Sequence, residues 1–262
     1  MSGYILCQTK KAEHPYFIEN ISTNIYSIEE LCYYLYHNLY LVDQTIINEE
    51  LCKWLEKELE LVKLASKIRQ GMEHQSGIED ILYPVFKEIN YLTYEELKVL
   101  NSQFAELNQE TPAVRQKRKG DSLVENKMYA NAIRVYQKIL DKTEFPKERT
   151  GLETEVMYNL GCAYSYLFQM EKAMECFWNA YIRSGSADEK ALKAYLLAFR
   201  SIRNKEEYTH RMQELKISDE LKNDIEDSLD HFAKIPEKPV NADDMDSMLE
   251  KITRDYHRST GS

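Results

Sequence analysis

The sequence contains little glycine or proline and no long apolar run. Only 8 of its 262 residues are glycine and 6 are proline, which leaves few residues for the turns of a β-sandwich or for a glycine-rich phosphate loop. No segment approaches the roughly 18 consecutive apolar residues of a membrane-spanning helix. The opening residues 1–7 lack the charged start and apolar stretch of a secretory signal. We therefore expect an all-α protein that is located in the cytoplasm and does not contact membranes.

An excess of basic residues is also missing. The chain has 34 Lys and Arg against 44 Asp and Glu, a formal charge of -10, which speaks against a general nucleic-acid-binding protein. The densest basic run, residues 115–119 (Arg-Gln-Lys-Arg-Lys), is short and contains no aromatic residue. We interpret it as the solvent side of a helix rather than as a nucleic-acid site.

Patterns typical of metal-binding and catalytic sites are absent. The five cysteines are odd in number, widely scattered and without a C-x-x-C pair, so neither a disulfide framework nor a zinc ribbon is expected. The sequence contains no phosphate-loop, dinucleotide-binding, zinc-protease or serine-hydrolase motif. Three Glu-Glu pairs fall in the first turns of predicted helices, where their charge complements the helix dipole. We therefore expect no enzyme, no cofactor and no metal site.

The first hundred residues are largely helical by their apolar periodicity. Ser27 and Thr93 are each followed by Glu three residues later, a capping box in which hydroxyl and carboxylate satisfy free backbone N–H groups. We predict helices near residues 27–38, 48–70, 77–90 and 93–108, with Pro84 kinking or splitting the third. Residues 4–8 and 16–20 are candidates for a short β-hairpin that precedes these helices.

A repeated motif occupies the middle of the chain. Residues 154–183 read TEVMYNLGCAYSYLFQMEKAMECFWNAYIR, and residues 117–140 (KRKGDSLVENKMYANAIRVYQKIL) carry similar residues at similar places. A spacing of 41 relates Gly120 to Gly161, Ala132 to Ala173 and Tyr136 to Phe177. The two units are therefore in register, with about seven residues inserted between them near residues 143–151.

The motif resembles the tetratricopeptide repeat (TPR), a 34-residue helix-turn-helix unit. Its characteristic positions are occupied by Met157, Leu160, Gly161, Tyr164, Ala173, Phe177 and Ala180. Small residues at Gly161 and Ala173 let the two helices of a unit cross closely, and Tyr164 and Phe177 fill the space between them. The resemblance implies a right-handed superhelix of helical hairpins whose concave face, lined by the first helices, binds a peptide or helix.

The repeat pattern weakens towards the C-terminus. Residues 188–203 and 205–215 form a degenerate third pair, because Glu207 stands where a small residue is expected. We predict the following organisation: a helical N-terminal domain at 1–110, TPR-like repeats at 113–215, a capping helix at 218–234, a linker at 235–241 and a flexible tail at 242–262.

The resemblance implies a set of candidate partner-binding residues on the concave face. They are Lys117, Asp121, Asn159, Cys162, Ser165, Tyr166 and Lys193. Some TPR domains grip the C-terminal carboxylate of chaperone peptides with Lys, Asn and Arg side chains. Lys117 and Asn159 match that clamp and Lys193 can replace its Arg, but Asp121 and Glu189 would repel a carboxylate.

These features predict a cytoplasmic scaffold or adaptor that binds a protein or peptide in the concave groove. An alternative is a regulator in which capture of a peptide rearranges the N-terminal domain. The tail adds an amphipathic helix with an apolar stripe at Met245, Met248, Leu249, Ile252 and Tyr256. We expect this stripe to occupy an apolar groove of the same or another molecule, where it competes with the ligand, and to allow self-association.

Overall fold

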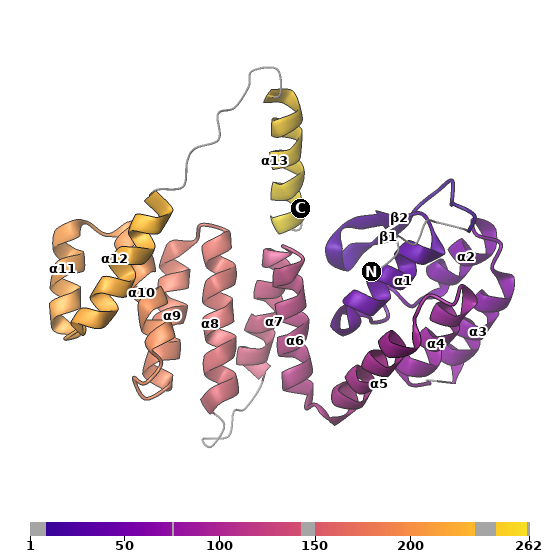
Figure 1. The fold of residues 1–262 in the computed structure, drawn as a ribbon, viewed down its shortest axis with the longest axis horizontal. Coiled ribbons are helices and arrows are strands. Elements are labelled where there is room, and N and C mark those ends of the chain that lie inside the picture. Colours follow the sequence, from indigo (N-terminus) through magenta and orange to yellow (C-terminus); the bar gives the residue numbers. More distant parts are fainter. Residues whose placement is uncertain (1–8, 75, 143–149, 234–244, 261–262) are drawn as a thin grey trace. The chain divides into compact units, whose positions relative to one another are not determined.

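The protein is mostly helical, which confirms the predicted all-α class. The computed structural model describes residues 9–74, 76–142, 150–233 and 245–260. These residues form thirteen α-helices, two short 3-10 helices and one two-stranded antiparallel sheet (Figure 1). The chain divides into two compact units, residues 1–122 and 123–262, which we call unit 1 and unit 2.

Unit 1 contains the small sheet and most of the shorter helices. Its elements are β1 (Tyr16–Ile18), η1 (Glu19–Ile21), β2 (Thr23–Ile25), α1 (Ile28–His37), η2 (Leu39–Leu41), α2 (Glu49–Lys57), α3 (Val62–Glu73), α4 (Ile78–Glu88) and α5 (Tyr94–Gln109). The chain passes from unit 1 to unit 2 within α6 (Pro112–Glu125). The core of unit 1 is apolar, with Ile28, Leu35, Leu51 and Leu64 among the side chains that are completely buried.

The small sheet pairs two strands that are adjacent in sequence. Tyr16 faces Ile25 and Ile18 faces Thr23 in the antiparallel register. The 3-10 helix η1 and Ser22, which has a positive φ of 47°, reverse the chain over four residues. The sequence analysis did not predict β2. The expected partner of β1, residues 4–8, lies outside the described residues.

The single helix expected at residues 48–70 is two helices, α2 and α3. Glu60 has a φ of 61°, which a helix interior does not allow. The Leu61 N–H donates to the Leu55 carbonyl at 2.8 Å and closes the turn, while Leu59 is buried beneath it. By contrast, Pro84 does not split the third predicted helix, because α4 continues on both sides of it.

The predicted helix starts in unit 1 are confirmed by their caps. Thr93 Oγ1 accepts from the Glu96 N–H at 3.2 Å, and Glu96 Oε2 accepts from the Thr93 N–H at 2.8 Å, which completes a capping box. Ser27 Oγ accepts from the Glu30 N–H at 3.2 Å. The Glu30 carboxylate accepts from the N–H of Tyr26, one residue before the expected donor.

Unit 2 is a series of helices, most of which pack against their sequence neighbours (Figure 1). They are α7 (Tyr129–Lys142), α8 (Thr150–Tyr166), α9 (Met170–Arg183), α10 (Glu189–Ile202), α11 (Lys205–Glu214), α12 (Asp219–Ala233) and α13 (Met245–Thr260). α8 packs between α7 and α9, and α9 also packs against α10. The predicted helices at 188–203, 205–215 and 218–234 are confirmed to within one residue at each end.

The same type of turn, with a positive φ and an N–H that donates to the carbonyl five residues earlier, occurs at four helix ends in unit 2, and two of the four copies lie 41 residues apart. Lys127 and Phe168 both have positive φ, 61° and 56°. The Met128 N–H donates to the Leu123 carbonyl at 2.8 Å, and the Gln169 N–H donates to the Tyr164 carbonyl at 3.0 Å. Buried positions repeat with the same spacing in four pairs: Leu123 and Tyr164, Ala132 and Ala173, Tyr136 and Phe177, Ile139 and Ala180.

α8 and α9 approach closely at Gly161, as its position in the motif predicts. A Cβ atom at Gly161 would lie 2.6 Å from Cε1 of Phe177, closer than side chains tolerate. On the α9 side, Ala173 is completely buried. In the degenerate third pair, Glu207 has a local role, since its carboxylate and N–H form a capping box with Asn204 at the start of α11.

Candidate interaction surface

Polar and aromatic side chains lie together on one side of α8, next to α10. Tyr158, Cys162 and Tyr166 are each one turn apart on α8, so they lie on one side of the helix, with Asn159 at its edge. The Lys190 Nζ of α10 lies over the Tyr158 ring, 4.3 Å from its centroid. We call the surface made of Tyr158, Asn159, Cys162 and Lys190 the α8–α10 face.

Packing beneath the α8–α10 face fixes its aromatic ring. The Tyr158 ring packs on Phe177 of α9 with 5.3 Å between centroids. Its hydroxyl carries a pKa that burial raises well above the usual range, so it stays protonated and donates hydrogen bonds at neutral pH. Tyr158 therefore presents a preorganised edge that combines apolar contact with a polar hydroxyl.

Cys162 is half-buried in this face, and its surroundings disfavour the thiolate form. Burial raises the pKa of its thiol, although the hydrogen bond with Tyr158 and the charge of Lys190 act in the opposite direction. Burial also raises the pKa of Cys176 on α9 to about 11. Because the thiolate is the reactive form, burial lowers the reactivity of both thiols at neutral pH.

Two of the predicted groove residues form an ion pair in unit 1. Lys117 Nζ lies 3.0 Å from Asp121 Oδ2, one turn along α6. Asp121 thus already pairs with the Lys117 ammonium group, with which a bound carboxylate would have to pair. This agrees with the expectation from sequence that Asp121 opposes a carboxylate clamp.

The other predicted residues have different surroundings. Ser165 Oγ donates to the Gly161 carbonyl within α8 at 3.0 Å. Tyr166 is exposed, and its ring stacks on Tyr129 of α7 with 4.5 Å between centroids and 6° between planes. Lys193 Nζ contacts Asp224 Oδ2 of α12 at 2.5 Å, so it connects α10 to the capping helix rather than lying over Tyr158.

The structure therefore brings together only part of the predicted set. Asn159, Cys162 and Tyr166 share one side of α8. The sequence analysis missed Tyr158 and Lys190, although each lies one turn before a predicted residue, Cys162 and Lys193 respectively. Helical spacing alone would have included both.

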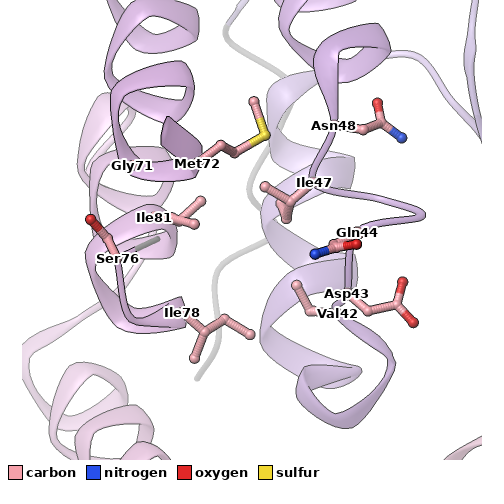
Figure 2. A pocket seen from close by; sticks show the side chains of 10 residues that line it. All are labelled: Val42, Asp43, Gln44, Ile47, Asn48, Gly71, Met72, Ser76, Ile78 and Ile81. Carbon is pink, nitrogen blue, oxygen red and sulfur yellow. The ribbon is translucent and has the colours of Figure 1, made fainter. Parts of the chain in front are cut away.

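Unit 1 contains an open groove that sequence reasoning did not predict. It has a volume of about 830 Å³ and lies between the segment at residues 42–48 and the α3–α4 turn. Figure 2 shows Met72 and Ile81 facing Ile47 across the gap, with Asp43 directed outward.

The Lys119 Nζ contacts the Asp43 carboxylate at 2.6 Å. Burial favours a higher pKa for Asp43, but hydrogen bonds from Lys119 and Thr45 outweigh it and lower that pKa. Asp43 is therefore ionised at neutral pH and held in place by these hydrogen bonds.

The described part of the chain contains neither a metal-binding cluster nor a membrane-spanning helix. Its His, Cys, Asp and Glu side chains form no group of three or more that is able to hold a metal ion. Of its helices, none is both long and apolar enough to cross a membrane.

In comparison with known proteins, no family profile, no curated protein and no solved structure matches the chain.

Proposed function

We propose that the protein is an interaction scaffold in which a TPR-like array binds a peptide or helix of a partner protein on the α8–α10 face. The observation that carries the proposal is the 41-residue repetition of one turn and four buried positions in unit 2. Stacked helical hairpins of this kind present one helix of each pair on a common surface. A cytoplasmic location is part of the proposal and follows from the sequence expectation.

The chemistry of the α8–α10 face suits recognition of a peptide. Tyr158 offers a rigid ring with a polar hydroxyl, and Lys190 offers an exposed cation. Lys190 already lies over the Tyr158 ring, so its ammonium group is held where an acidic side chain of a ligand would meet it. We therefore expect the bound segment to carry an acidic residue beside an apolar one.

Reversal of the charge on Lys190 tests this assignment. Lys190→Glu removes the cation from the α8–α10 face, so a partner that uses this face should lose about tenfold or more in affinity. Partners captured from the native cell by the full-length chain would be identified by mass spectrometry, and the dissociation constants of the purified partners would then be measured.

Lys172 provides a matched control for Lys190. Its Nζ lies 5.3 Å from the centroid of the Tyr164 ring, but it belongs to α9, whose surface lies outside the α8–α10 face. Lys172→Glu should therefore keep the wild-type affinity and the same melting temperature as Lys190→Glu. Equal affinities of the wild type and Lys190→Glu for every captured partner would overturn the proposal.

A further inference from the structure

The groove of unit 1 continues into a second hollow that borders α6. This hollow has a volume of about 510 Å³. Val42, Asp43 and Ile78 line both hollows, so the two are continuous. We call the combined surface the extended groove. It runs from the α3–α4 turn at one end to the first turns of α6, residues 112–119, at the other.

The end of the extended groove at the α3–α4 turn is apolar. Ile47 is buried there, whereas Met72, Ile78 and Ile81 are each half-buried, so part of each side chain remains accessible. Figure 2 shows that Met72 and Ile81 face Ile47 across the gap. A methionine side chain adapts its shape to the apolar group that it meets. This end therefore suits the insertion of an apolar side chain of a ligand.

The end of the extended groove at α6 is polar and carries an unbalanced positive charge. Arg115, Gln116 and Lys119 line it, and their spacing places them on one side of α6. Asp43 accepts from Lys119 Nζ at 2.6 Å and, through its other carboxylate oxygen, from Thr45 Oγ1 at 2.6 Å. In the described part of the chain, the Arg115 guanidinium has no hydrogen bond or ion pair. Of the three charged side chains that line this end, Arg115 is thus the one whose charge is not already paired.

We propose that the extended groove binds a short segment of a partner protein in which an acidic residue lies close to an apolar one. An open groove with successive hollows suits an extended peptide, because neighbouring side chains enter different hollows. The apolar side chain enters beside Met72 and Ile81, and the carboxylate pairs with Arg115. A guanidinium group binds a carboxylate through two parallel hydrogen bonds, which fixes the orientation of the acid. The amide of Gln116 supplies a further donor at the same end.

One acidic side chain near the α6 end opposes this ligand and provides a test of the charge argument. Glu79 Oε1 accepts from Nδ2 of Asn108, which lines the hollow, at 3.3 Å. Glu110, by contrast, is already paired with Arg118 at 2.6 Å. Glu79→Gln should therefore strengthen the binding of an acidic peptide, whereas Arg115→Glu should weaken it. Opposite effects of the two substitutions distinguish charge complementarity from general damage to the groove.

Peptides selected from a displayed library of random sequences test the proposal. The full-length chain would select them, and we expect the enriched sequences to carry an acidic residue close to an apolar one. Arg115→Glu should lower the affinity for these peptides about tenfold. A lysine in place of the acidic residue of the peptide should restore the affinity for that variant. Lys98→Glu, at an exposed position of α5 outside the groove, is the matched control and should bind like the wild type.

Methyl NMR of the full-length chain would locate the bound peptide. The methyl signals of Met72 and Ile81 should shift during the titration, and Met72→Asp should abolish binding while circular dichroism stays unchanged. The proposal is overturned if no peptide is enriched, or if Arg115→Glu and Lys98→Glu bind the selected peptides equally well. It is also overturned if only Lys190→Glu loses them. That last result would support the α8–α10 face, so the two proposals fail independently.

Discussion

At the scale of single residues, Gly161 sets the distance between α8 and α9. The nearest ring atoms of Phe177 lie 2.6 Å and 2.8 Å from the place that a Cβ of residue 161 would occupy. A methyl group there forces the ring or the helix to move, and overpacking of this kind typically costs about 1–3 kcal/mol. The gain in helix propensity from glycine to alanine, about 1 kcal/mol, offsets only part of that cost.

We predict that Gly161→Ala destabilises the protein, and Gly151 provides the control. Gly151 also lies in α8, but a Cβ there has no atom within 4 Å. Gly151→Ala should therefore leave the free energy of unfolding unchanged or raise it by up to about 1 kcal/mol. In a Phe177→Leu background the cost of Gly161→Ala should shrink, because the ring that it meets is gone. Chemical denaturation measures the free energies of unfolding of the wild type and of these four variants, and equal values for the two alanine variants would contradict the packing assigned to α8 and α9.

Residue-level prediction from sequence works where packing is periodic. Gly161, Ala173 and Phe177 could be assigned in advance, because their spacing reflects the close crossing of two helices. Lys193 was assigned to the groove by the same spacing, yet its long side chain reaches Asp224 of α12. The place of a lysine along a helix determines the position of its Cβ atom but not that of its ammonium group. The long side chain lets the ammonium group pair with a nearby opposite charge.

At the scale of helices, Arg211 holds α11 against the preceding pair. α11 has no buried residue, so apolar burial contributes little to its attachment. The Arg211 guanidinium lies 4.7 Å from the centroid of the Trp178 ring and 5.6 Å from that of Tyr195. Its Nε donates to the Tyr195 hydroxyl at 2.9 Å. One side chain of α11 thus contacts both α9 and α10.

We predict that Arg211→Ala loosens α11 selectively. Loss of the ring contacts and of the hydrogen bond should cost about 1–3 kcal/mol. Hydrogen exchange should then accelerate at the amides of α11 and remain slow in α8 and α9, because local opening follows local contacts. Arg203→Ala, at an exposed arginine just before α11, should leave exchange unchanged. Uniform acceleration throughout unit 2, or none in α11, would show that Arg211 does not have this role.

The ends of helices could be predicted from the sequence only where the residues of a side-chain cap are visible in it. Thr93 and Glu96 define the start of α5 in advance, because both partners of the capping box are visible in the sequence. The break between α2 and α3 could not be predicted in this way, since Glu60 adopts a left-handed conformation without the glycine that usually signals it. The contacts of Arg211 depend on residues from three helices and have no local pattern.

At the scale of the whole molecule, unit 2 combines a repeated packing pattern with surfaces that the pattern does not determine. The helices in the periodic part of unit 2 could be predicted, because the same pattern of buried positions recurs along the sequence. The groove of unit 1 depends on side chains that are not part of any period, whereas Tyr158 and Lys190 of the α8–α10 face follow helical spacing but are not among the characteristic positions of the motif. The identity of a partner depends on those surfaces. The sequence pattern alone therefore predicts a class of ligand but not a particular partner.

Site-specific photo-cross-linking tests most directly whether a partner binds at the α8–α10 face. A photoreactive residue would be placed at Asn159, within the face, and in a second variant at Glu175, an exposed position on α9. Both variants would be illuminated with a purified partner that the full-length chain captures. The account predicts a covalent adduct from position 159 and none from position 175. Cross-linking from position 175 alone would contradict the central claim.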